Sequence, residues 1–301
     1  MIDFAIEWSQ MSAIEREILT QPADWRRAAA LAPRYQDVLP RQDERVAVVG
    51  CGTSWFMAQA YAAAREASGG GETDAFAASE MPSGRRYDRT VAISRSGTTS
   101  EVVRLLSSRT DTSPVVVVTA LADSPVARQA SAVIELGFAD EQSVVQTRFA
   151  TTALALLLSS AGLPIEDEAV SAEMALTSPL PDLLSPDRFV FLGVGWTVGL
   201  ANEAALKFRE AAGAWAEAYP AMEYRHGPIS ASASSTLVWP LGPVDAAVLE
   251  DAARAGSAVS PNTLSPLATL VLAQRAAVDL AVARNLDPDH PHSLTRSVVL
   301  P

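Results

Sequence analysis

Short apolar runs alternate with longer, helix-length stretches along the first half of the chain. The run VVVVT at 115–119 is apolar in its first four positions, which is typical of a strand buried on both faces of a parallel sheet. Further strands are expected at 46–50, 74–78, 90–94 and 132–136. The apolar stretch 145–161 predicts a long helix. This alternation predicts an α/β fold with a doubly wound parallel sheet, in which ligands bind beyond the carboxyl ends of the strands.

The same strand, glycine and helix pattern then occurs a second time. Residues 46–54 read VAVVGCGTS, and residues 189–197 read FVFLGVGWT. In the first copy a helix is expected at 55–67, and in the second copy at 198–212. The remaining elements expected in the second half are a strand at 236–241 and a long apolar helix at 266–284. Two similar halves of domain size predict an internal duplication.

The duplication gives a provisional division of the chain. Residues 1–45 form a helical leader, residues 46–177 a first domain, and residues 188–301 a second domain that includes the C-terminal tail. The segment SPLPDLLSPD at 178–187 carries three prolines, so we expect it to be the linker between the domains.

Composition narrows the class of protein. The chain has 301 residues and a net charge of −12, and no basic stripe is present to neutralise phosphates, so nucleic acid is excluded as a partner. The single Cys51 fits a reducing compartment, and the three histidines form no metal-ligand pattern. The acidic N-terminus does not resemble an export signal, and the apolar run at 153–158 is too short to span a bilayer. We expect a cytoplasmic protein without membrane, metal or cofactor.

The segment 200–227 contains the clearest candidate chemistry. Glu203, Lys207 and Glu210 are spaced i, i+4, i+7, so they share one face of the expected helix. His226 follows in the sequence Tyr-Arg-His-Gly-Pro. Taken alone, the spacing fits a solvated helix with an ordinary Glu–Lys pair as well as it fits an acid/base site.

Two loops at strand ends are candidates for an anion site. Gly50 and Gly52 suggest a dinucleotide motif, but Trp55 stands where that motif needs a third glycine. Thr53 and Ser54 instead place hydroxyl groups at a helix N-terminus, which suits a phosphate. The second loop, SRSGTT at 94–99, supplies Ser94, Arg95, Ser96, Thr98 and Thr99 around a glycine. Hydroxyl-rich loops after two strands of one sheet favour a phosphorylated ligand over simple helix capping.

At these residues the chain resembles the sugar isomerase (SIS) domain family. It is most similar to the tandem isomerase half of glutamine–fructose-6-phosphate aminotransferase and to the stand-alone glucosamine-6-phosphate deaminases and fructosamine deglycases. The matching pieces are EREILTQP (15–22), GCGTS (50–54), ASE (78–80), SRSGTT (94–99), EAALKFRE (203–210), AEAY (216–219), E-x-x-HGP (223–228) and LTRSV (294–298).

The resemblance implies two tandem SIS domains, each a parallel sheet flanked by helices, that bind a sugar-6-phosphate. By this resemblance, Glu210 moves a proton between C1 and C2, Lys207 and Glu203 assist it, and His226 opens the sugar ring from the neighbouring subunit of a homodimer. The residues that the resemblance assigns to the phosphate and sugar, together with Arg296 discussed below, are Gly52, Thr53, Ser54, Ser94, Arg95, Ser96, Thr99 and Gln146.

Some positions depart from the aminotransferase pattern. Arg296 stands where that family has the lysine that forms a Schiff base, and a guanidinium stays protonated and cannot form an imine. Arg95 and Thr98 replace a glutamine and a glutamate, and Gln146 replaces a serine. No glutaminase domain is evident in the sequence, so we expect no glutaminase activity. These departures favour the catabolic relatives.

The expected reaction is conversion of glucosamine-6-phosphate to fructose-6-phosphate and ammonia. A fructosamine-6-phosphate deglycase and a simple aldose–ketose isomerase are alternatives within the same chemistry. An alternative of another class is a sugar-phosphate-binding regulator without catalytic activity. Such a regulator has no need for Glu210 or His226, and the leader leaves little room for a DNA-binding domain.

Overall fold

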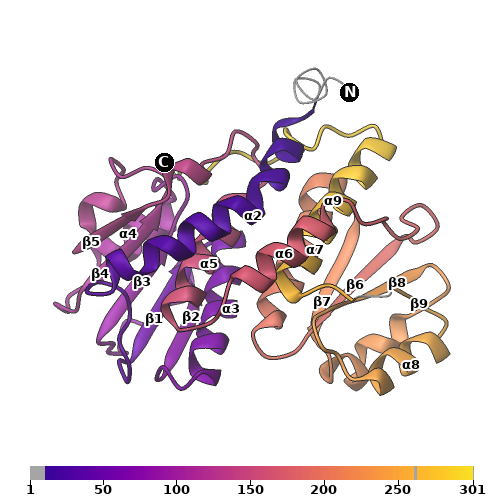
Figure 1. Ribbon diagram of the computed structural model, residues 1–301, viewed down its shortest axis with the longest axis horizontal. Coiled ribbons are helices and arrows are strands. Elements are labelled where there is room, and N and C mark those ends of the chain that lie inside the picture. The colour runs from indigo at the N-terminus through magenta and orange to yellow at the C-terminus, as the bar shows by residue number, and fades with distance from the viewer. Residues whose placement is uncertain (1–10, 261–262, 301) are drawn as a thin grey trace.

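The computed structural model describes residues 11–260 and 263–300, and these residues form two parallel β-sheets flanked by helices. The five-stranded sheet has the order β2-β1-β3-β4-β5 and the four-stranded sheet the order β7-β6-β8-β9 (Figure 1). The expected α/β class with parallel sheets flanked by helices is therefore confirmed. The strands are β1 (Val46–Gly50), β2 (Thr73–Ala77), β3 (Arg89–Ile93), β4 (Val115–Thr119), β5 (Ala132–Glu135), β6 (Arg188–Gly193), β7 (Trp215–Pro220), β8 (Thr236–Leu241) and β9 (Ala258–Val259).

All seven expected strands form, with shifts of one residue at some ends. The sequence pattern missed β7 and β9, and it missed the helices α6 and α8. The helices are α2 (Ala13–Leu31), α3 (Thr53–Ala67), α4 (Ser100–Ser107), α5 (Arg148–Ser160), α6 (Glu166–Ala175), α7 (Thr197–Ala212), α8 (Ala246–Arg254) and α9 (Pro266–Ala283). The N-terminal ten residues of the expected leader lie outside the described residues.

Helices α3 and α7 join the two halves and show the repeat in three dimensions. Asn202 of α7 donates a hydrogen bond of 2.9 Å to Gln59 of α3, and these two residues are 143 positions apart, as are Gly50 and Gly193. Gly199 allows the close approach, because a Cβ there would lie 2.5 Å from the Phe56 carbonyl oxygen. The second sheet also repeats the strand order of the first four strands of the first sheet. The fold is therefore built from two similar units, whose exact domain limits stay a prediction.

One connected group of buried side chains runs through both halves. It includes Val48 of the first sheet, Phe191 of the second sheet, and much of α5, α7 and α9. Because apolar burial drives folding and this core is continuous, the two halves support each other's packing.

Helix α9 is long and apolar enough to cross a membrane by length and composition alone. Yet 72% of its apolar window is buried inside the protein, where α9 packs against α6 and α7 (Figure 1). It is therefore a core helix of the second half.

The leader folds back across the first half as α2. A capping box begins this helix, because the Ser12 hydroxyl accepts a hydrogen bond from the Glu15 amide and the Glu15 carboxylate accepts one from the Ser12 amide. The helix packs on α5, and its fully buried Trp25 donates a hydrogen bond of 2.9 Å to the Thr151 hydroxyl. The leader is thus part of the core rather than an appendage.

Candidate active site

Most of the predicted site residues meet at one cavity of about 160 Å³ beyond the carboxyl ends of β1 and β3. Five segments that are far apart in the sequence contribute to it. Its lining residues are Cys51, Gly52, Thr53, Ser54, Ile93, Arg95, Ser96, Thr99, Val102, Val144, Gln146, Glu210, Leu294, Thr295, Arg296, Ser297 and Val298. This is the edge of the sheet at which parallel α/β folds bind ligands.

The loop 94–99 turns sharply between β3 and α4. Gly97 has a φ of +61°, and a Cβ there would lie 2.0 Å from the Ser124 hydroxyl, so only glycine fits. The Ser96 hydroxyl accepts hydrogen bonds from the Thr98 amide and hydroxyl, which closes the loop. Ser94, the first residue of the loop, is buried and does not line the cavity. Its hydroxyl has no hydrogen-bond partner among the described residues.

Substituting Gly97 by alanine is therefore expected to damage the site. The alanine Cβ would displace Ser124, and the alanine itself would have to adopt left-handed backbone angles. We therefore expect a loss of about 1–3 kcal/mol in the free energy of unfolding. The affinity for a sugar phosphate should fall at least about tenfold, because the loop hydroxyls move. Denaturant unfolding and calorimetry measure the two effects. Gly84→Ala is the matched control, because a Cβ at Gly84 meets nothing within 4 Å, and an equal effect in both variants would contradict the account.

Glu203, Lys207 and Glu210 lie together on α7, as their spacing predicts. The Lys207 ammonium forms an ion pair with the Glu210 carboxylate and lies 3.4 Å from Glu203 Oε1. It also donates a hydrogen bond of 3.1 Å to the Thr53 hydroxyl at the start of α3. The side chain of Lys207 is 1% exposed and that of Glu210 is 19% exposed, so of the three only Glu210 lines the cavity. The alternative of a solvated helix face is therefore wrong.

Burial and neighbouring charges shift the pKa values of Glu203 and Lys207. Burial raises the pKa of Glu203 to about 8, because Lys207 offsets only part of the desolvation and Glu210 repels a second negative charge. Burial acts to lower the pKa of Lys207, but the two carboxylates outweigh it and the net shift is upward. Near neutral pH the group therefore holds one proton on Glu203 and one Lys207–Glu210 ion pair.

This arrangement makes stability depend on pH. Between pH 4.5 and about 8, the folded protein holds a proton on Glu203 that the unfolded chain has released. The free energy of unfolding therefore falls as pH rises through this window. Between pH 5 and 8 we expect the wild type to lose about 2–4 kcal/mol more than Glu203→Gln. Denaturant titrations at several pH values measure this difference. Glu250→Gln, on the exposed face of α8, is the control, and parallel curves for wild type and Glu203→Gln would overturn the assignment.

Arg95 and Arg296 have partners that the sequence did not reveal. Arg95 is 1% exposed, faces the buried Glu141 carboxylate at 3.5 Å, and donates to the carbonyl oxygens of Ser143 at 3.1 Å and Arg296 at 2.9 Å. The Arg296 guanidinium forms two hydrogen bonds, of 2.7 and 2.8 Å, with the Asp140 carboxylate. Arg95 thus supports the cavity wall, and direct phosphate binding by either arginine stays a prediction.

His226 and Cys51 lie differently with respect to this cavity. His226 ends the short 3₁₀ helix Glu223–His226, is exposed, and does not line this cavity of its own chain. Cys51 does line it, and burial together with Glu101 raises its pKa to about 11, so it is a poor nucleophile. Sequence reasoning missed the tail residues around Arg296, although the LTRSV motif marked that segment.

Comparison with known proteins identifies part of the chain. Residues 41–160 match the model of the SIS domain family. This matched segment contributes the loops 51–54 and 94–99 and Gln146 to the cavity, whereas Glu210 and the tail come from outside it.

The curated relatives include the glutamine–fructose-6-phosphate aminotransferase of Methanothermobacter thermautotrophicus, which is 26% identical over 311 aligned positions. That alignment covers 85% of this chain and 52% of the relative. The corresponding enzyme of Sulfurisphaera tokodaii is 30% identical over 203 positions, covering 62% of this chain and 34% of the relative. The chain thus spans about half the length, or less, of these relatives.

Solved structures show the same fold over nearly the whole chain. The glucosamine-6-phosphate deaminase of Thermotoga maritima has a TM-score of 0.79 at 24% identity and covers 96% of this chain, with all of that chain matched. The tagatose-6-phosphate ketose/aldose isomerase of Escherichia coli has a TM-score of 0.77 at 18% identity, covering 95% of this chain and 98% of that one. The likeness in fold therefore extends past residues 41–160 into the second half.

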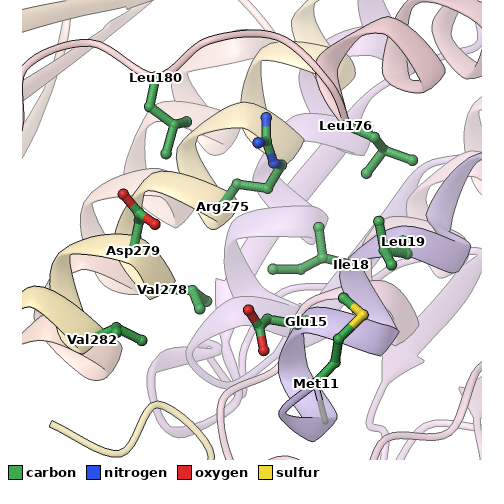
Figure 2. A pocket seen from close by; sticks show the side chains of 10 residues that line it. All are labelled: Met11, Glu15, Ile18, Leu19, Leu176, Leu180, Arg275, Val278, Asp279 and Val282. Atoms are coloured by element: carbon green, nitrogen blue, oxygen red, sulfur yellow. The ribbon is translucent and has the colours of Figure 1, made fainter. Parts of the chain in front are cut away.

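A larger cavity of about 330 Å³ lies outside residues 41–160, between α2 and α9. Figure 2 shows its lining, which is mainly apolar, with Glu15, Arg275 and Asp279 as the charged groups. Arg275 donates to the carbonyl oxygens of Ala175 and Ser178, and the negative charge of Asp279 also acts on it, so the cavity offers an anion no strong site. Most of the residues that the sequence predicts for the site line the smaller cavity instead.

Proposed function

We propose that the protein is a phosphosugar isomerase/deaminase that converts glucosamine-6-phosphate and water to fructose-6-phosphate and ammonia. The observation that carries this proposal is the position of Glu210. It is a partly exposed carboxylate, paired with a buried ammonium, that faces the same cavity as the hydroxyl loop of the SIS domain. Relatives and structural neighbours named as aminotransferases, deaminases and isomerases of hexose phosphates support the same chemistry.

The phosphate end of the substrate would lie at the loop 94–99. Ser96 and Thr99 line the cavity there, next to the N-terminus of α4, and Thr53 and Ser54 begin α3 on the adjacent strand end. Two helix N-termini and several hydroxyl groups suit a dianion even in a protein of net charge −12.

The sugar end would then lie toward Glu210. In the open-chain substrate, Glu210 removes the proton from C2 and returns it to C1. A proton passes from the amine nitrogen to O1 in the same conversion, so C1 becomes an alcohol and the C2 amine becomes an imine. Addition of water to C2 then expels ammonia and leaves the ketose. Lys207 offsets the charge that develops on the enediol-like intermediate, through its contact with Glu210.

His226 and the oligomeric state belong to the same proposal. Because His226 is exposed and lies outside the cavity of its own chain, it is available to open the sugar ring in a second subunit. We therefore propose a homodimer with sites shared between subunits, working in the cytoplasm.

The second half is best explained as a diverged second SIS domain without a ligand site of its own. The sheet order and the paired glycines support the common origin. At α8, the helix that follows β8 as α4 follows β3, the Asp245 carboxylate accepts a hydrogen bond of 2.9 Å from the Ala247 amide. A fixed negative group thus occupies the place where α4 leaves room for an anion.

The test is a substrate panel for the purified protein, read by ammonia release and by ketose formation. Glucosamine-6-phosphate is expected to give both products in equal amounts. Release of an amino acid from fructosamine-6-phosphates would identify a deglycase, and interconversion of unaminated hexose phosphates alone would identify a simple isomerase. Binding of sugar phosphates with no turnover of any would contradict the proposal and indicate a regulator.

A further inference from the structure

The segment 140–147 forms one wall of the cavity but has no regular structure. Val144 and Gln146 line the cavity from this segment, which leads from β5 into α5. Its backbone groups are not part of a strand or helix ladder, so side chains must fix its position. The side chains that hold this segment come in part from helix α2.

Glu17 of the leader helix α2 holds the centre of this segment. Its Oε1 atom accepts hydrogen bonds from the amides of Gln142 at 2.5 Å and Ser143 at 3.3 Å. Glu17 is 4% exposed, so these hydrogen bonds are shielded from water. Helix α2 thus reaches the cavity wall from outside the SIS domain.

The held segment is connected to the rest of the site. The Ser143 carbonyl accepts a hydrogen bond from Arg95, and Arg95 donates another to the Arg296 carbonyl in the tail. The Glu141 carboxylate accepts from the Thr147 and Arg148 amides at the start of α5. A shift of Gln142 and Ser143 would therefore reach both Gln146 and the tail.

A second contact ties the same parts together. The Asp289 carboxylate accepts from the amides of Ala13 and Ile14 at the start of α2, at 2.7 and 2.8 Å. The Asp289 carbonyl accepts from the Val144 amide at 3.2 Å. The beginning of α2 is thus linked through Asp289 both to Val144 in the wall and to the tail that follows Asp289.

We propose that Glu17 is a positioning residue for the sugar-phosphate reaction, which holds the wall 140–147 and, through Arg95, the tail over the bound sugar. This inference rests on the proposed function. Stability alone does not account for Glu17. Burial and the nearby Glu141 raise its pKa, and its Oε2 atom has no hydrogen-bond partner among the described residues. Ile14, Ile18 and Trp25 already anchor α2 in the core, where an apolar residue would serve better.

The experiment compares Glu17→Leu, Glu17→Asp and Glu17→Gln. Leucine removes the acceptor and aspartate is too short to reach the amides, so both should lower kcat/KM at least about tenfold, mainly through KM. Glutamine keeps an oxygen at the Oε1 position and should stay within about threefold of wild type. Hydrogen exchange, followed by mass spectrometry, should rise across 140–147 in the first two variants and not in the third.

Ile18→Ala is the matched control on α2. It removes a buried side chain that lines the cavity between α2 and α9, so it should lower the melting temperature and leave kcat/KM within about twofold. Equal loss of kcat/KM in Ile18→Ala and Glu17→Asp, or unchanged exchange across 140–147 in the aspartate variant, would overturn the proposal. If the wild type turns over no sugar phosphate, the proposed function fails, and the exchange measurement still decides whether Glu17 holds the wall.

Discussion

Replacing Glu210 by glutamine is expected to lower kcat on glucosamine-6-phosphate by about 10²–10⁴-fold, the usual contribution of a positioned general base. The amide is almost isosteric but cannot take a proton from carbon. The loop hydroxyls and helix N-termini that hold the phosphate are unchanged, so KM should stay within about threefold. Steady-state kinetics with ketose formation as the signal measures both constants.

The control for this substitution is Glu250→Gln on α8, which removes the same charge far from the cavity lining. It should leave kcat within about twofold. A Glu210→Gln variant that keeps more than half of the wild-type kcat would exclude Glu210 as the base, whatever its effect on KM.

Replacing Lys207 by methionine is expected to lower the free energy of unfolding by about 3–5 kcal/mol at pH 8, the usual result of removing one partner of a buried ion pair. Methionine fills much of the same volume, so the loss comes from charge rather than from a cavity. The substitution leaves the carboxyl groups of Glu203 and Glu210 without the Lys207 ammonium that contacts both of them. The loss should shrink at pH 5, where the Glu203 carboxyl is protonated. Denaturant unfolding at pH 5 and pH 8 measures it.

The double variant Glu203→Gln/Lys207→Met provides the check on this explanation. With only one carboxylate left, it should recover part of the lost stability, so the two substitutions should not be additive. A loss below about 1 kcal/mol in Lys207→Met, or full additivity, would show that the buried charges are not coupled as the contacts indicate.

The sequence predicted the elements that local pattern controls. The apolar run of β4 and the spacing of Glu203, Lys207 and Glu210 on α7 are set by neighbours within one element, so period and spacing reveal them. Spacing did not reveal that Lys207 is buried, because burial depends on α3 and α9 packing against α7. The edge strand β7 reads WAEAYP, and it was missed because alanine, glutamate and proline are residues that are depleted in strands.

The roles of the arginines could not be predicted for a similar reason. The partners of Arg95 lie 46 to 201 positions away, and two of them are backbone carbonyls, which leave no mark in the sequence. Arg148 at the start of α5 likewise donates a hydrogen bond of 3.0 Å to the Asp140 carbonyl, a partner that the sequence does not mark. Charge type is visible in a sequence, but the direction in which a long side chain points is set by the tertiary fold.

The central claim is that this cavity moves a proton between C1 and C2 of a sugar phosphate. The most direct test incubates the protein with fructose-6-phosphate and ammonium in D₂O and follows the C1 hydrogens by NMR, with Glu210→Gln alongside. We predict that the wild type replaces a C1 hydrogen with deuterium or forms glucosamine-6-phosphate, and that the variant does neither. Unchanged C1 signals and no aminosugar with folded wild-type protein would contradict the account.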